Sequence, residues 1–261
     1  MSYVVNKQYY DRPEMAEYYG MDTSLWKSEE AILLFLQDEI KDRPLLEIGV
    51  GAGRTTPYLK AISDDYIGID YSLNMIKLCS RRNPDAMLAV ADARYMTLFN
   101  DEQFTSVFWC FNGIDDVDAG DRMLILNEVR RVLSADGIFV FSSHNLDCKS
   151  SPPFSLKRLT FGFNRMERAD NAKRLRSQLR SLLACIKKAL FGKEHAIIYE
   201  YEEDTGMVLP TYYIGKPEQS RQLLKAGFAD VRAFGMDGHE IHQDRSVVDR
   251  WIYYVARKRA S

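Results

Sequence analysis

The sequence predicts an α/β protein with a Rossmann-like, doubly wound and mostly parallel sheet. Three observations lead to this prediction. Short apolar runs alternate with segments of helical periodicity, the apolar runs contain almost no polar residues, and a glycine-rich turn joins the first run to the helix after it. Strands without polar alternation are typical of a parallel sheet covered on both faces, and right-handed crossovers then give the doubly wound topology.

The expected elements follow the chain in order. A helix is predicted over residues 28–40, where Ser28 and two acidic residues precede an apolar face. The alternation that follows predicts strands at 45–48, 66–69, 87–90, 106–111 and 138–142 and helices at 55–61, 73–81 and 121–133. An amphipathic helix over 171–190, a hairpin of 196–201 and 207–214, a helix over 217–227 and strands at 231–234 and 252–256 complete the chain.

This order predicts three parts. Residues 1–40 form an amino-terminal helical cap segment. Residues 41–147 and 211–261 form the Rossmann-like core, and residues 148–210 form an inserted basic lid of one helix and one hairpin.

Composition excludes several classes of protein. The net charge of −2 is unlike that of a nucleic-acid binder, and we expect no DNA partner. The amino terminus lacks a basic start followed by an apolar run, and no segment has the roughly 18 apolar residues of a membrane span. The four cysteines form no C-x-x-C pair, so neither a metal site nor a redox dithiol is expected. A cytoplasmic location is the simplest interpretation.

The turn after the first predicted strand carries the strongest functional signal. Gly49, Gly51 and Gly53 alternate there, and glycine allows a sharp turn and the close approach of a ligand to the main chain. A dinucleotide fingerprint would read G-x-G-x-x-G, but here Arg54 stands at the position of the third glycine, which comes one residue early at Gly53. Glu47 precedes the first glycine, and its charge suits an ammonium or sulfonium centre better than a pyrophosphate.

Two acidic residues follow at the ends of the next two strands. Asp70 ends the second strand, where a carboxylate accepts hydrogen bonds from both hydroxyls of a ribose. Asp92 ends the third strand, within reach of an adenine amino group. Open α/β sheets bind ligands at the carboxyl ends of their strands, so these residues are expected at one site.

The glycine turn, Asp70 and Asp92 together resemble the class I S-adenosylmethionine methyltransferases, closely over residues 40–145 and loosely over 210–258. The resemblance implies S-adenosylmethionine as the cofactor. The residues it assigns to that cofactor are Tyr10, Tyr19, Glu47, Gly49, Gly51, Gly53, Thr55, Asp70, Tyr71, Met75, Asp92, Ala93, Phe111 and Asn112. Thr105 departs from the family, which often has aspartate near the start of the fourth strand. Each assigned residue also has a structural alternative, such as a turn, a helix cap or core packing.

Two residues are candidates for the chemistry. Asp116 follows the fourth strand and is either a general base or the cap of the next helix. His144 ends the fifth strand and is either a base or acceptor-orienting donor, or a hydrogen-bonded structural residue. Tyr212 and Tyr213 of the hairpin either contact the acceptor or pack internally.

The leading hypothesis is transfer of a methyl group to an oxygen or nitrogen of a small molecule. The alternatives are an RNA or protein methyltransferase that uses the basic insertion, and a catalytically idle cofactor-binding protein. Between Lys149 and His195, twelve basic and three acidic residues give +9, so the total of −2 leaves −11 for the rest. We expect this segment to cover the site and to attract a carboxylated or phosphorylated acceptor; RNA, an anionic membrane surface and a solvated helix face are the other interpretations.

Overall fold

The computed structural model describes residues 2–149, 168–192, 195–203, 205–242 and 249–259. Three parts of the predicted insertion lie outside these ranges: residues 150–167, residues 193–194 and Asp204. The described helices are α1 (Ser2–Tyr10), α2 (Pro13–Tyr19), α3 (Lys27–Ile40), α4 (Thr56–Ile62), α5 (Leu73–Arg82), α6 (Ala119–Val132), α7 (Arg168–Phe191) and α8 (Lys216–Lys225), with a 3-10 turn η1 (Gly113–Asp115). The described strands are β1 (Leu45–Ile48), β2 (Tyr66–Asp70), β3 (Met87–Val90), β4 (Phe104–Trp109), β5 (Leu133–Asn145), β6 (His195–Glu202), β7 (Met207–Ile214), β8 (Phe228–Phe234) and β9 (Trp251–Lys258).

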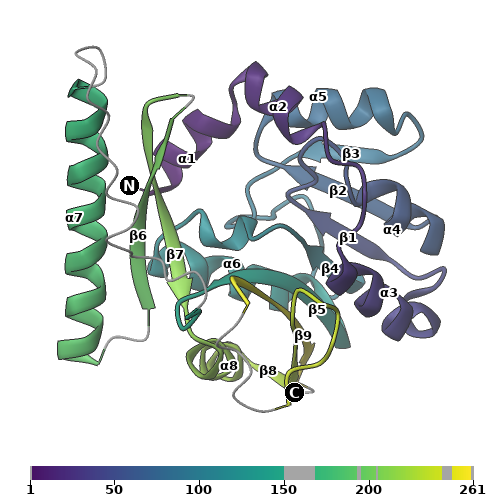
Figure 1. Ribbon diagram of the computed structural model, residues 1–261. Coiled ribbons are helices and arrows are strands. Elements are labelled where there is room, and N and C mark those ends of the chain that lie inside the picture. Colours follow the sequence, from purple (N-terminus) through teal and green to yellow (C-terminus); the bar gives the residue numbers. More distant parts are fainter. Residues whose placement is uncertain (1, 150–167, 193–194, 204, 243–248, 260–261) are drawn as a thin grey trace.

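The described strands form one sheet in the order β3-β2-β1-β4-β5-β7-β6, with β9 pairing with β5 and β8 (Figure 1). The strands β3, β2, β1, β4 and β5 run parallel, whereas β9 is antiparallel to β5 over residues 138–144. The strand β7 joins β5 only at His144 and Asn145, so the hairpin of β6 and β7 extends beyond the core sheet. This topology confirms the predicted Rossmann-like α/β fold with a mostly parallel sheet.

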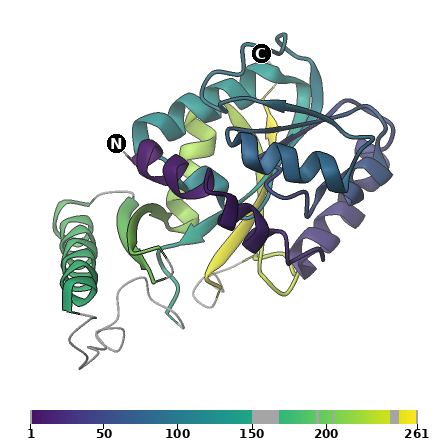
Figure 2. The same ribbon diagram turned by 90° about the horizontal axis from the view of Figure 1, so that it is seen from above.

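Helices cover both faces of the sheet. Neighbouring residues of a strand point to opposite faces, so they pack against different helices. Val107 packs in the core beneath α6 and α8, and Phe108, the next residue, packs in the core beneath α3 and α4. Both side chains are almost fully buried, which explains the unbroken apolar run that predicted this strand. Viewed from above, α1 and α2 pass across the carboxyl-terminal edge of the sheet, and α7 stands outside the hairpin (Figure 2).

The fifth strand differs from the prediction. Asp136 and Gly137, which precede the strand predicted at 138–142, lie within β5, where the ladder with β4 is interrupted between Phe104 and Ser106 and Asp136 has a φ of 58°. β5 begins at Leu133, which pairs with Phe104. The chain then bulges, and its pairing with β4 resumes at Ile138. Among the described helices, none is both long and apolar enough to span a bilayer.

Candidate active site

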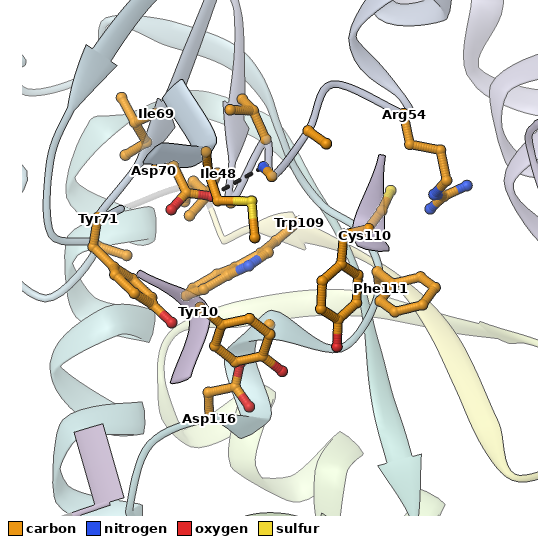
Figure 3. A pocket seen from close by; sticks show the side chains of 18 of the residues that line it. Tyr10, Ile48, Arg54, Ile69, Asp70, Tyr71, Trp109, Cys110, Phe111 and Asp116 are labelled. Carbon is orange, nitrogen blue, oxygen red and sulfur yellow. Dashed lines mark hydrogen bonds between the residues drawn. The ribbon is translucent and has the colours of Figure 1, made fainter. Parts of the chain in front are cut away.

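A cavity of about 390 Å³ lies at the carboxyl ends of β1, β2 and β4 (Figure 3). The loops after these strands form its floor, and residues from α1, α2 and the segment before α3 form its roof. The predicted residues that line it are Tyr10, Tyr19, Gly49, Gly51, Thr55, Asp70, Tyr71, Met75, Asp92, Ala93, Phe111 and Asp116. These residues are spread over about a hundred positions of the sequence, from Tyr10 to Asp116, and the topology of the sheet brings them together.

The glycine loop supplies backbone groups rather than side chains to the cavity. Gly51 has a φ of 53°, and its amide donates a 3.0 Å hydrogen bond to the Oδ2 atom of Asp70. A Cβ atom built at Gly51 would meet no atom within 4 Å, so this position faces open space. Gly53 does not line the cavity: a Cβ atom there would lie 2.9 Å from the sulfur of Cys79. Gly53 is therefore needed for close packing of the loop on α5.

Asp70 lies at the centre of the floor, and its carboxylate is already oriented. Besides the Gly51 amide, the Ser72 amide donates to its Oδ1 atom over 2.8 Å. Burial raises the pKa of Asp70 to about 6, against the opposing effect of these hydrogen bonds. A carboxylate has about four acceptor positions, so two backbone donors leave capacity for the hydroxyls of a ribose.

Glu47 does not line the cavity, and the prediction that it contacts the cofactor is corrected. Its carboxylate lies beneath the loop, where the hydroxyls of Thr55, Thr56 and Tyr66 donate to it, the Thr56 bond over 2.9 Å. Burial raises the pKa of Glu47 in spite of these donors. The acidic residue before the glycines therefore stabilises the turn from beneath. The sequence pattern does not distinguish this structural role from contact with a ligand.

Asp92 lines the cavity but has a partner. The guanidinium of Arg94 donates to both of its oxygens, the closest pair of atoms being 2.7 Å apart. Burial alone would raise the pKa of Asp92, but the hydrogen bonds from Arg94 hold it below its usual value. Arg94 also lies 3.6 Å from the ring centroid of Tyr3, and it bonds to Asp121 over 2.9 Å. An adenine amino group near Asp92 would share a carboxylate that Arg94 already engages.

Aromatic side chains close the cavity from above. The ring centroid of Tyr19 lies 5.6 Å from that of Tyr10 and 6.0 Å from that of Phe111. Trp26 contacts Phe111 at 5.3 Å and stacks on Trp251 at 4.4 Å. These contacts give α1, α2 and the segment before α3 a common apolar surface over the site.

Asp116 faces the cavity beside Tyr10 (Figure 3). It does not cap the next helix, because the carboxylate of Asp118 caps α6 by accepting from the Gly120 and Asp121 amides. Burial, together with the charge of Asp115, raises the pKa of Asp116 well above its usual range, against a hydrogen bond from Tyr10. A carboxyl group with a raised pKa at a cavity is a recognised feature of functional sites.

His144 and Asn112 do not line the cavity. The Nδ1 atom of His144 lies 2.8 Å from the Oδ2 atom of Asp115, and its backbone amide donates to the same oxygen over 2.6 Å. Asp115 is fully buried and also forms an ion pair with Arg122 at 2.5 Å. The backbone amide of Asn112 donates to Ser142 over 2.7 Å, and its side chain is buried. Both predicted residues therefore belong to the packing behind the site.

The prediction that the basic insertion covers the site finds no support in the part of the insertion that the structure describes. No described residue of α7, β6 or β7 lines the cavity. Tyr212 is buried beneath the guanidinium of Arg122, 4.5 Å from its ring centroid, and the Tyr213 hydroxyl donates to Glu200 over 2.8 Å. The hairpin instead supports the roof, since the Asn6 side chain of α1 donates to the carbonyl groups of Pro210 and Asp116.

The sequence interpretation did not assign several residues that line the cavity: Tyr3, Asn6, Trp26, Arg54, Arg94 and Trp109. Arg54 is the most informative of them. Both ends of its guanidinium bond to the carboxylate of Glu29 at 2.6 Å, and it also donates to the Ser24 carbonyl over 2.9 Å. Arg54 therefore ties the segment before α3 to the glycine loop. Its place in a loop after a strand was a usable signal, whereas nothing in the sequence singled out Tyr3.

The comparisons with known proteins agree with this geometry. Residues 46–141 match the family described as a methyltransferase domain. An uncharacterized protein of Methanocaldococcus jannaschii is 26% identical over 252 residues, which cover 95% of this chain and 83% of the relative.

Two solved structures share the fold. One is a Thermotoga maritima S-adenosylmethionine-dependent methyltransferase named as a possible histamine N-methyltransferase, with a TM-score of 0.57, 15% identity and coverage of 99% of this chain and 100% of that one. The other is the Burkholderia thailandensis 1,6-didemethyltoxoflavin-N1-methyltransferase, bound to 1,6-didemethyltoxoflavin and S-adenosylhomocysteine, with a TM-score of 0.53, 12% identity and coverage of 90% and 79%.

The fold and the cavity define an α/β enzyme that binds a nucleoside cofactor at the carboxyl edge of its sheet. The buried Asp70 carboxylate and the open backbone at Gly51 fit such a cofactor. The methyltransferase domain matched over residues 46–141 contains the strands that build the cavity, so the protein is an S-adenosylmethionine-dependent methyltransferase with S-adenosylmethionine as its cofactor, and its fold is consistent with the class I enzymes of this kind.

Proposed function

We propose that this enzyme methylates an oxygen or nitrogen atom of a small molecule. The observation that carries the proposal is the aromatic roof. It covers the cavity with side chains from α1, α2 and the segment before α3. A cavity of about 390 Å³ is near the lower end of the range for small-ligand sites. A site covered by an aromatic roof suits a small acceptor better than a segment of RNA or protein.

We further propose that Asp116 binds the acceptor and takes its proton. When bound, S-adenosylmethionine supplies an electrophilic methyl group. Asp116 lines the cavity, and its raised pKa makes its carboxylate a stronger base than an ordinary aspartate. The aromatic side chains of Tyr10 and Tyr19 would hold the acceptor and exclude water. His144 is the weaker candidate, because its Nδ1 atom faces Asp115 and its ring packs 4.7 Å from Tyr213, behind the cavity.

The names of two structural neighbours support a small acceptor. The Burkholderia enzyme holds a small heterocycle, and the Thermotoga protein is named for histamine. The basic insertion offers little support for RNA as the acceptor, since no described residue of α7 lines the cavity.

The proposal is tested by incubating the enzyme with methyl-labelled S-adenosylmethionine and a cell extract separated into small molecules, RNA and protein. We expect label in the small-molecule fraction. Label that enters only RNA or protein would overturn the proposed acceptor class and leave the methyltransferase assignment intact. A Gly51→Val enzyme, which should not bind the cofactor, serves as the blank.

Once an acceptor is in hand, Asp116→Asn and His144→Ala separate the two candidate residues. We expect Asp116→Asn to lower kcat by roughly 100-fold or more, the usual scale for loss of a general base, with little change in cofactor affinity. His144→Ala should lower kcat much less. A larger loss of kcat in the His144 variant, with Asp116→Asn near wild type, would reverse these roles.

A further inference from the structure

The helix α7 turns its small polar side chains toward the protein. Ser177 and Ser181 are buried on this side, although serine is usually exposed. The Ser181 hydroxyl accepts from the backbone amide of Tyr199 in β6 over 2.8 Å and contacts the Ser177 carbonyl at 2.9 Å. Ala184 and Cys185 pack beside them against the hairpin. Small side chains allow the helix to lie close to the strand.

The large apolar side chains of α7 point the other way. Leu179, Leu183, Ile186 and Leu190 keep 50%, 54%, 42% and 73% of their surface exposed. Their spacing of four, three and four residues places them in one stripe along the helix. Because four large side chains in a row are exposed, this stripe is a contiguous apolar surface rather than a single exposed leucine.

A row of cations lies alongside the stripe. Lys173, Arg176, Arg180 and Lys187 are all exposed, and their spacing of three, four and seven residues places them on one line of the helix. The sequence of α7 contains seven basic residues and one acidic residue, Asp170, which gives a net charge of +6. The outer surface of α7 therefore combines an apolar stripe with an adjoining basic row.

The helix is held in this orientation near both of its ends. Arg174 forms an ion pair with Glu203 after β6, and Lys188 lies 3.7 Å from Asp147 after β5. Together with the Ser181 bonds to β6, these contacts keep the stripe turned outward, since rotating α7 would break them and bury the basic row.

From this surface we propose that α7 docks on an anionic lipid membrane, and that the enzyme works at a membrane surface. The stripe would enter the boundary between headgroups and acyl chains, and the basic row would bind lipid phosphates. Charge favours lipid over the other occupants. In a second copy packed stripe to stripe, the two basic rows would repel each other, and RNA would bind the cations but leave the stripe in water.

The inference does not depend on the proposed acceptor. The cavity opens at the carboxyl edge of the core sheet, and no described residue of α7 lines it, so a docked helix leaves it accessible. Variants of α7 should therefore bind S-adenosylhomocysteine as the wild type does, which also reports that they are folded.

The test is cosedimentation of the full chain with vesicles of phosphatidylcholine alone and of phosphatidylcholine with about a third phosphatidylglycerol. We expect binding to the anionic vesicles only, weakening as salt is raised. Both a double variant Leu183→Gln, Leu190→Gln and a double variant Arg176→Glu, Arg180→Glu should lower binding at least tenfold. The matched controls are Leu224→Gln on α8 and Lys77→Glu, Arg81→Glu on α5, which alter exposed residues elsewhere and should bind normally.

Each other outcome would overturn the proposal. Docking through α7 would be excluded if the wild-type protein did not sediment with anionic vesicles, or if the α7 variants bound these vesicles as tightly as the controls. A dimer in sedimentation without lipid, lost in the leucine variant, would identify a second copy as the occupant. Tight RNA binding that depends on the arginines but not on the leucines would identify a nucleic-acid surface instead.

Discussion

The helices α3 and α7 have similar sequence patterns and opposite orientations. In α3, Ile32, Leu36 and Ile40 recur at helical spacing, and all three are buried on the sheet. In α7, the stripe that contains Leu183 and Leu190 recurs in the same way and is exposed. The difference lies in what each helix covers: α3 packs on the middle of the sheet, whereas α7 packs on a two-stranded hairpin.

This comparison shows the limit of hydrophobic periodicity. The pattern identifies which side chains share a face of a helix, but not whether that face is turned inward. The sequence interpretation favoured a placement of α7 over the site, with an anionic membrane surface and RNA as the alternatives. Buried polar groups instead mark the inner side of α7, through Ser177 and Ser181.

The largest expected effect is on the buried ion pair behind the cavity. Asp115→Ala should lower the free energy of unfolding by about 3–5 kcal/mol, because Arg122 would be left buried without its charged partner. Urea denaturation measures the change. Arg174→Ala, which breaks the exposed pair with Glu203 on α7, is the control and should cost less than about 1 kcal/mol. Equal losses would mean that the buried ion pair and the exposed ion pair do not differ in their contribution to the free energy of unfolding.

Next in size is the effect of a side chain in the glycine loop. Gly51→Val should weaken S-adenosylhomocysteine binding by at least about 100-fold, or some 2.7 kcal/mol, since the side chain would project into the open space of the cavity. Valine at a positive φ is strained, so a modest fall in Tm is expected with the fold retained. Calorimetry measures the affinity. Wild-type affinity in this variant would show that the cofactor lies elsewhere.

A smaller effect is expected from pH. The pKa of Asp70, raised to about 6 by burial, means that the folded protein holds this proton more tightly than the unfolded chain does. The free protein should therefore lose stability as pH rises from about 4 to about 6. Ribose hydroxyls donate to the carboxylate form, so the Kd of S-adenosylhomocysteine should rise about tenfold per pH unit below 6 and stay constant above it.

Asp70→Asn is the control for this pH dependence, because it cannot ionise. It should bind more weakly than the wild type at pH 8 and show no transition near 6. A transition near 6 that survives in the asparagine variant would assign the titration to another group.

The smallest expected effect tests the helix comparison directly. Leu183→Gln on α7 should change the free energy of unfolding by no more than about 0.5 kcal/mol, as for other exposed positions. Leu36→Ala on α3, whose side chain is fully buried, should cost about 2–5 kcal/mol. Thermal unfolding of the two variants measures the contrast. A large loss in the Leu183 variant would show that the stripe is covered within the protein.

Local sequence was enough to predict the sheet and the floor of the cavity. Alternation of apolar runs and helices specifies a parallel sheet, and the ends of parallel strands meet at one edge, so Gly51, Asp70 and Ala93 could be placed together in advance. These inferences depend on neighbours in sequence and on a topology with few alternatives.

Side-chain direction and long-range contacts were decided only by the tertiary structure. Glu47 turned beneath the loop because three hydroxyls satisfy its buried charge there, and His144 turned toward Asp115. Arg54 lines the cavity because Glu29, twenty-five residues away, binds its guanidinium. A polar side chain turns toward whichever partner best offsets its loss of water, and the sequence does not specify which distant partner the fold brings within reach.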